Sequence, residues 1–271
     1  MGSDHKPLAG RRIVVTRAPE QSAELTRALE ALGADVIAFP MVSVVPPKDS
    51  RELDEQLRRL DEFDAILFLS GNAVKYTFDR CAQLGIECDL LSSGNRLVAA
   101  VGPATARPLA EKGIRVAHIA EKGTGEALVR ELRDSLTGRR ILIPRSDRGD
   151  ERVPSLLKDL GANVTEVVAY RTAAPASVDA AVRDRIRRAE IDAVIFASPS
   201  AFRNFVSAVG PAEAVALGAR VVFVAIGPTT ARSIREAGAR VAAQSESASA
   251  ADLARAVAAH CPDHPEAARR A

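Results

Sequence analysis

The sequence repeats itself once, and this repeat constrains the fold more than any other feature. GRRIVVTR (residues 10–17) returns as GRRILIPR (residues 138–145). FDAILFLSGNA (residues 63–73) returns as IDAVIFASPSA (residues 191–201). Both matches are offset by 128 residues. Because there are two copies and no longer array, the repeat predicts two homologous halves rather than a solenoid.

Each half alternates short apolar runs with helix-like segments. AILFL (residues 65–69) and LVAAV (residues 97–101) are continuous apolar runs. Such runs are typical of strands buried on both faces of a parallel sheet. AVKYTFDRC (residues 73–81) and TTARSIREAG (residues 229–238) have helical spacing, and the second ends at a glycine, a common helix stop. The alternation predicts an α/β fold.

Composition and charge exclude several function classes. Of the 271 residues, 47% are apolar and 27% charged, which is ordinary for a soluble globular protein. The formal net charge of +2 implies neither a nucleic-acid nor a membrane partner, and no apolar run approaches the ~20 residues that span a bilayer. The N-terminus MGSDHKPLAG lacks the apolar core of a signal peptide. Three cysteines without paired spacing fit a reducing cytoplasm.

The histidines and cysteines do not predict a metal site. None of the four histidines lies in an H-E-x-x-H motif, and no C-x-x-C motif occurs. His260, Cys261 and His264 cluster in the C-terminal tail, which we interpret as a solvated terminus. We therefore expect no metal and no other cofactor.

Two kinds of strand-to-helix junction each occur twice. VGPATAR (residues 101–107) matches IGPTTAR (residues 226–232), and LSGNA (residues 69–73) matches ASPSA (residues 197–201). Ligands of an open parallel sheet gather at the carboxyl ends of its strands, where free N–H groups of helix N-termini favour anions. At one junction alone, Ser or Thr is more simply a helix cap. Four junctions facing a shared cleft favour binding of an extended polyanion.

The candidate binding residues at these junctions are of three kinds. Glycines allow a ligand to approach the backbone, hydroxyl and amide side chains lie beside the free amides, and a small residue follows them in the first turn. The set is Ser70, Asn72, Gly102, Thr105, Ser198, Ser200, Ala201, Gly227, Thr229 and Thr230.

Other motifs carry weaker hypotheses. Arg17 and Arg145 follow the first strand of each half, and either could clamp a carboxylate or pair between the lobes. GTGEAL (residues 123–128) lacks the third glycine of a dinucleotide loop, so we interpret it as a capped helix start. RDRIRRAE (residues 183–190) is most simply a solvated helix face, although Arg185 or Arg188 could contact an anion.

Six short motifs together carry a family resemblance. It covers about residues 10–257, and the chain resembles the uroporphyrinogen-III synthase family, the cyclising enzymes of tetrapyrrole biosynthesis. The motifs are VVTR (residues 14–17), FLSGNAV (68–74), VGPATA (101–106), VAYRT (168–172), FASPSAF (196–202) and AIGPTTAR (225–232).

The resemblance implies a bilobed fold, with two parallel-sheet α/β lobes joined by a two-stranded β-ladder and a cleft between them. Residues 1–38 with 176–271 would form the first lobe, and residues 45–168 the second. The Pro-bounded segments FPMVSVVPP and VVAYRTAAP then supply the hinge strands, residues 39–44 and 169–175.

The substrate that the resemblance implies is hydroxymethylbilane, a linear tetrapyrrole with an acetate and a propionate on every ring. The enzyme would close it to uroporphyrinogen III with inversion of ring D and loss of water. By the same resemblance Tyr170 would assist departure of the hydroxyl, and Thr230 would donate a hydrogen bond to the substrate, with Thr105 as its weaker counterpart. The simpler role of Tyr170 is an aromatic residue that packs at the hinge.

A second hypothesis is a non-catalytic protein of the same two-lobed shape that binds a tetrapyrrole or another small anion. For either hypothesis we expect a cytoplasmic monomer, because no coiled-coil heptad or swapped element is evident. Hydroxymethylbilane synthase is the expected source of the substrate, and no nucleic acid or membrane takes part.

Overall fold

The computed structural model describes residues 6–247 and 249–261 of the chain. His264, one member of the tail cluster, lies outside these residues. The chain folds as two units. Unit 1 comprises the chain up to Ser43 and from Ala173 onward, and unit 2 comprises Val44–Thr172. Because the strands of both units alternate with helices, the predicted α/β class is confirmed. The expected lobe boundaries and the hinge ladder stay predictions.

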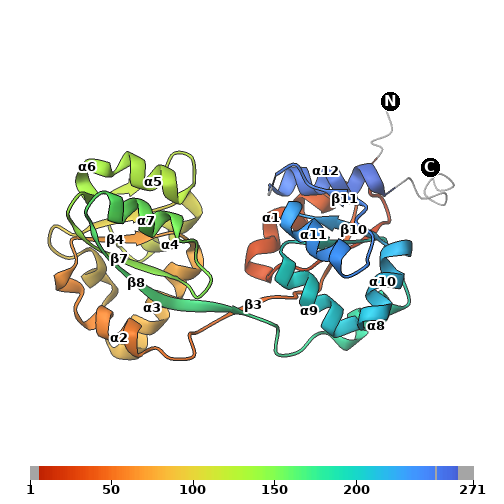
Figure 1. Ribbon diagram of the computed structural model, residues 1–271, viewed down its shortest axis with the longest axis horizontal. Helices are drawn as coiled ribbons and strands as arrows, with labels where there is room; N and C mark the ends of the chain where they lie inside the picture. Colours follow the sequence, from red (N-terminus) through yellow and green to blue (C-terminus); the bar gives the residue numbers. More distant parts are fainter. Residues whose placement is uncertain (1–5, 248, 262–271) are drawn as a thin grey trace. The chain divides into compact units, whose positions relative to one another are not determined.

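Unit 1 holds a five-stranded sheet in the order β11-β10-β9-β1-β2, and its strands run parallel. Figure 1 shows the red first helix beside the blue last helix, and α1 and α12 are in contact. Its elements are β1 (Arg12–Val15), α1 (Pro19–Ala31), β2 (Asp35–Ala38), α8 (Ala180–Arg187), β9 (Ala193–Phe196), α9 (Pro199–Val209), α10 (Pro211–Arg220), β10 (Val222–Ala225), α11 (Pro228–Glu236), β11 (Ala243–Gln244) and α12 (Ala250–His260).

Unit 2 holds a six-stranded sheet in the order β3-β8-β7-β4-β5-β6, in which β4 to β8 form parallel pairs. Its elements are β3 (Ser43–Val45), α2 (Arg51–Arg58), the 3-10 turn η1 (Leu60–Glu62), β4 (Ala65–Phe68), α3 (Gly71–Leu84), the 3-10 turn η2 (Cys88–Ser92), β5 (Leu97–Ala100), α4 (Pro103–Glu111), β6 (His118–Ile119), α5 (Gly125–Glu131), α6 (Arg133–Leu136), β7 (Arg140–Ser146), α7 (Arg152–Asp159) and β8 (Asn163–Ala173).

The two sheets have the same plan, as the sequence repeat requires. Strand by strand, β11-β10-β9-β1-β2 corresponds to β6-β5-β4-β7-β8. Each sheet therefore combines strands from both copies of the repeat. A backbone contact recurs with it: the Asp64 carboxylate accepts from the Arg140 N–H at 2.9 Å, and the equivalent Asp192 accepts from Arg12 at 2.8 Å.

Both faces of each sheet are covered by apolar side chains. Along β9, Val194 and Phe196 belong to one core cluster, whereas Ala193 and Ile195 belong to the other. Alternation of this kind follows from the period of two in a strand. The first cluster contains edge-to-face phenylalanine pairs around Phe196. The rigid sheets hold the loops at their carboxyl edges in place, and those loops carry the candidate site.

Candidate active site

The strand-to-helix junctions lie at the carboxyl edges of the two sheets, and two of them are capped by serine. Ser70 follows β4 and accepts a hydrogen bond from the Ala73 N–H at 3.1 Å. Ser198 follows β9 and accepts from the Ala201 N–H at 3.0 Å. These contacts confirm both serines as helix N-caps. They also occupy the N–H of Ala201, a candidate binding residue that is itself fully buried.

The two glycine–proline junctions start α4 and α11. Pro103 and Pro228 are the first helical residues, a position that suits proline because its missing N–H would have no helical partner there, and they follow the extended N-cap residues Gly102 and Gly227. Glycine has no side chain with which to cap these two N-termini. Beside them, Thr105 and Thr230 are 5% and 2% exposed, whereas Thr229 is exposed.

A pocket with a volume of about 400 Å³ lies at the carboxyl edge of the unit 2 sheet. Its lining includes three of the predicted site residues, Ser70, Arg145 and Tyr170. It also includes Thr124, which caps α5 by accepting from the Ala127 N–H at 3.2 Å, as the GTGEAL segment predicts. The volume falls in the range of small-molecule sites.

Tyr170 is held by two neighbours from other elements of unit 2. Its hydroxyl lies 3.0 Å from Ser70 Oγ. Its ring stacks on Tyr76, with ring centroids 5.9 Å apart and planes inclined by 24°. The Tyr76 hydroxyl in turn donates to the Val44 carbonyl at 2.5 Å. These contacts fix the Tyr170 phenol at the pocket lining.

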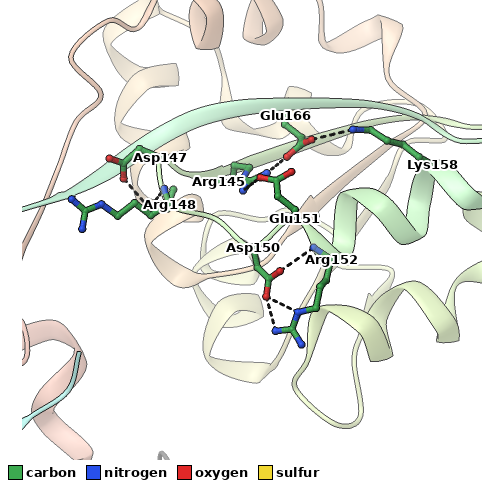
Figure 2. A network of polar contacts seen from close by, with 9 residues as sticks. Arg145, Asp147, Arg148, Asp150, Glu151, Arg152, Lys158 and Glu166 are labelled. Carbon is green, nitrogen blue, oxygen red and sulfur yellow. Dashed lines mark hydrogen bonds and ion pairs between the residues drawn. The ribbon is translucent and has the colours of Figure 1, made fainter. Parts of the chain in front are cut away.

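Arg145 also lines this pocket and is already paired (Figure 2). Its guanidinium forms ion pairs with Glu166 and Glu151, and its side chain is 13% exposed. Gly149 leaves the room that this guanidinium occupies, since a Cβ there would lie 2.2 Å from Arg145 Nε. Arg145 is therefore one centre of a charged network within unit 2.

The same network extends along the loop between β7 and α7. Arg152 contacts Asp150 and Glu126 with shortest distances of 2.5 and 2.9 Å (Figure 2 shows the Asp150 contact). Hydrogen bonds from Arg152 lower the pKa of Asp150. Arg152, Asp150 and Glu126 all line the pocket, so this wall carries both signs of charge.

Arg17 occupies the equivalent position in unit 1, just after β1. It is half-buried, and within residues 6–247 and 249–261 no side chain forms an ion pair or hydrogen bond with its guanidinium. Burial lowers the pKa of Arg17, an effect that the charge of Glu24 partly offsets. The guanidinium stays protonated at neutral pH, so unit 1 presents a positive charge at the edge of its sheet.

The remaining candidates are scattered more widely. Asn72 lies half-buried in the first turn of α3, and Ser200 accepts a hydrogen bond from Arg203 at 3.2 Å in the first turn of α9. Arg188 donates to Glu190 at 2.6 Å, in keeping with a solvated helix face. Sequence reasoning missed Tyr76 and the loop of residues 146–151. The clustering of Asp, Arg and Gly in that loop was the available signal.

Two negative findings concern the same described ranges. No helix there combines the length and apolar character needed to cross a membrane. No group of three or more His, Cys, Asp or Glu side chains there is placed to hold a metal ion.

A family model and curated relatives point to one family. A family model described as uroporphyrinogen-III synthase HemD matches residues 23–255. The uroporphyrinogen-III synthase of Synechococcus elongatus is 31% identical over 245 residues, which cover 89% of this chain and 92% of the relative. That of Chlorobaculum parvum is 26% identical over 231 residues, covering 84% and 90%.

Solved structures show the same fold. The structure of uroporphyrinogen-III synthase from Helicobacter pylori aligns with a TM-score of 0.58 at 16% identity, over 90% of this chain and 97% of that one. A mutant uroporphyrinogen III synthase from Thermus thermophilus aligns with a TM-score of 0.52 at 21% identity, over 91% and 96%. The matching family model and relatives show that this chain belongs to the uroporphyrinogen-III synthase family.

Proposed function

We propose that this chain converts hydroxymethylbilane to uroporphyrinogen III, and that it is a cyclising lyase of tetrapyrrole synthesis. The observation that carries the proposal is Tyr170, a fixed phenol at the lining of a pocket of about 400 Å³ in a member of this family. In the reaction, a C–O bond breaks and the hydroxyl leaves as water. The resulting cation attacks the ring D carbon that bears the bridge to ring C and forms a spiro intermediate. The old bond to that bridge then breaks and re-forms at the free α-carbon of ring D, which loses its proton, so the ring closes with ring D inverted.

Tyr170 assists the first step by donating a hydrogen bond to the departing oxygen. The pocket beside it would hold the ring that bears the hydroxymethyl group. The cation left behind is stabilised by the substrate's own pyrroles, so the protein needs no strong acid and no cofactor. Its main task is to hold the chain in the conformation that favours attack with inversion of ring D.

The acetates and propionates would be bound at the carboxyl edges of both sheets. Backbone N–H groups at helix N-termini suit carboxylates without requiring a basic protein. Arg17 would supply the one guanidinium, because it is half-buried and unpaired within the described part of the chain. We place in the same role Asn72, Gly102, Thr105, Ser198, Ser200, Gly227, Thr229 and Thr230, several of them through their backbone. Ser70, Arg145 and Ala201 lie at the same edges, but their polar groups already bond within the protein.

Three further points belong to the proposal. The cysteines Cys81, Cys88 and Cys261 are free thiols, which supports a reducing cytoplasm. The substrate would come from hydroxymethylbilane synthase. The chain would act as a monomer, because the pocket and Tyr170 belong to a single unit of one chain.

The alternative is a protein that binds the tetrapyrrole without converting it. Incubating the chain with freshly generated hydroxymethylbilane separates the two. A synthase makes the linear substrate disappear faster than in a blank. A binding protein raises the thermal unfolding midpoint in its presence and leaves the rate of disappearance unchanged or lower.

A further inference from the structure

The hydroxyl of Ser70 contacts two groups. The number of protons and lone pairs on a hydroxyl limits which of these contacts it can make as donor and which as acceptor. Its Oγ accepts from the Ala73 N–H at 3.1 Å and lies 3.0 Å from the Tyr170 hydroxyl. A serine hydroxyl has one proton and two lone pairs. The helix cap uses one lone pair, so one lone pair and the proton remain for Tyr170.

Two arrangements are possible, and they differ in where the Tyr170 proton goes. If Tyr170 donates to Ser70, its proton is used inside the protein. The Ser70 proton then has no acceptor within residues 6–247 and 249–261. If Ser70 donates to Tyr170, the proton without an acceptor inside the described protein is that of Tyr170, which lies at the pocket lining, where a ligand can accept it.

We propose that Ser70 is a positioning residue that donates to Tyr170, forming a chain from the Ala73 N–H through Ser70 to the phenol. The inference rests on the proposed function for its final acceptor, the departing hydroxyl of the substrate. Successive hydrogen bonds polarise one another, and the first donor here is a free amide at the N-terminus of α3. The chain therefore orients the phenol and makes it a stronger donor.

The internal repeat shows that a serine N-cap does not require a contact with a tyrosine such as the one between Ser70 and Tyr170. Ser198 is the counterpart of Ser70 and caps α9 in the same way. The counterpart of Tyr170 in the other copy is Val42, which has no hydroxyl. The serine is therefore sufficient as a cap in unit 1, and the tyrosine contact is an addition in unit 2.

A double-mutant cycle tests the proposed hydrogen-bond chain in the full-length protein. We expect Ser70→Ala to lower kcat about tenfold with KM changed less than about twofold. Ser70→Thr keeps a hydroxyl and should restore kcat to within about threefold. In a Tyr170→Phe background, Ser70→Ala should cause no further loss, because its effect acts through the phenol. Additive losses would overturn the proposal.

Ser249→Ala is the matched control for the lost cap. Ser249 caps α12 by accepting from the Asp252 N–H at 3.1 Å, and it lies outside the residues placed at the site. It should lower the unfolding midpoint about as much as Ser70→Ala does and leave kcat unchanged. An equal loss of kcat in both variants would assign the Ser70 effect to helix stability and overturn the proposal.

A second measurement reads the hydrogen bond without turnover. The chain has two tyrosines and no tryptophan, so in Tyr76→Phe protein Tyr170 is the sole tyrosine. The intensity ratio of its Raman Fermi doublet distinguishes a phenol that accepts a hydrogen bond from one that only donates. We expect an accepting phenol, converted to a donating one by Ser70→Ala. A phenol that only donates while Ser70 is present would overturn the proposed hydrogen-bond chain, whichever reaction the protein catalyses. Failure to form uroporphyrinogen III would instead overturn the proposed function.

Discussion

Arg17 and Arg145 occupy the same position of the internal repeat, but their surroundings differ in charge. Arg145 is paired with Glu166 and Glu151. The positions 128 residues earlier hold Ala38 and Ala23, so Arg17 lacks both counterions. One arginine is thus neutralised within unit 2, whereas the other has no counterion in the described part of unit 1, which supports its proposed contact with a substrate carboxylate.

Arg17→Ala should weaken substrate binding more than it affects stability. We expect KM to rise about tenfold, equivalent to about 1.4 kcal/mol, with kcat changed less than about threefold. The loss reflects one charge-assisted contact to a carboxylate. Steady-state kinetics measure it. Arg27→Ala, which removes an equal charge from the exposed face of α1, should leave KM unchanged. An equal rise in KM for both variants would show a general charge effect.

The contrasting variant is Arg145→Ala, which should act on stability. It leaves Glu166, 22% exposed, with Lys158 at 3.6 Å as its one remaining ion-pair partner among the described residues. We expect the free energy of unfolding to fall by about 1–3 kcal/mol, measured by urea denaturation. The change for Arg17→Ala should stay within about 0.5 kcal/mol. A larger loss of stability in Arg17→Ala than in Arg145→Ala would contradict the assignment of Arg145 to stability and Arg17 to substrate binding.

Tyr170→Phe should slow the reaction without abolishing it. The substitution removes the phenolic proton but keeps the ring that stacks on Tyr76. Because the pyrroles themselves help the hydroxyl to leave, we expect kcat to fall by about 10- to 100-fold. Complete loss of activity with an unchanged unfolding midpoint would mean that ionisation depends entirely on Tyr170. An unchanged kcat would remove Tyr170 from the mechanism.

Thr77→Val should stabilise the protein. The Thr77 side chain is fully buried in α3, and its Oγ1 has no hydrogen-bond partner within the described residues. A methyl group of similar shape removes the cost of the unpaired hydroxyl, so we expect unfolding to require up to about 1 kcal/mol more. Urea denaturation measures the change. A destabilisation instead would indicate a buried water bound to this hydroxyl.

Stability should decline at alkaline pH through Cys81. Burial, with the neighbouring Cys88, raises the pKa of Cys81 to about 12. In the unfolded chain the thiol ionises near pH ~8.5. As the pH rises, the unfolded state therefore loses this proton before the folded state does. The contribution of the Cys81 thiol to the free energy of unfolding is fully present below about pH 8 and is lost as the pH rises toward 12.

The predicted size is about 1 kcal/mol between pH 7.5 and pH 9.5 for this thiol. Urea denaturation at the two pH values measures it. Cys81→Ala lowers stability at both values but should flatten the decline by that amount. Burial also raises the pKa of Cys261, to about 11. The free energy of unfolding of Cys81→Ala should therefore still decline somewhat with pH. An identical pH dependence in Cys81→Ala and the unchanged chain would contradict the assignment.

The sequence was most informative where it repeats. The duplicated junctions predicted helix starts capped by serine, which Ser70 and Ser198 provide, because local hydrogen bonding decides these positions. The repeat did not reveal that β1 and β2 join β9 rather than β4. Equivalent strands fit either sheet equally well, so only the family resemblance pointed to the exchange.

Contacts between distant segments could not be predicted from the sequence. Ser70 and Tyr170 are 100 residues apart and meet only because β4, β7 and β8 are neighbours in one sheet. The pairing of Arg145 with Glu166 likewise depends on the register of β7 against β8. From the repeat, α7 would be expected to begin at the position equivalent to the start of α1. Instead residues 147–151, with Gly149 among them, form the loop that encloses Arg145.

The most direct test of the central claim is the isomer composition of the product. Purified chain is incubated with hydroxymethylbilane, the products are oxidised, and the uroporphyrin isomers are separated by chromatography beside a heat-denatured control. Uncatalysed closure gives the type I ring without inversion of ring D. We predict that type III dominates with the folded chain and type I with the control. Type I alone, at the rate of the control and from folded protein, would contradict the proposed synthase activity.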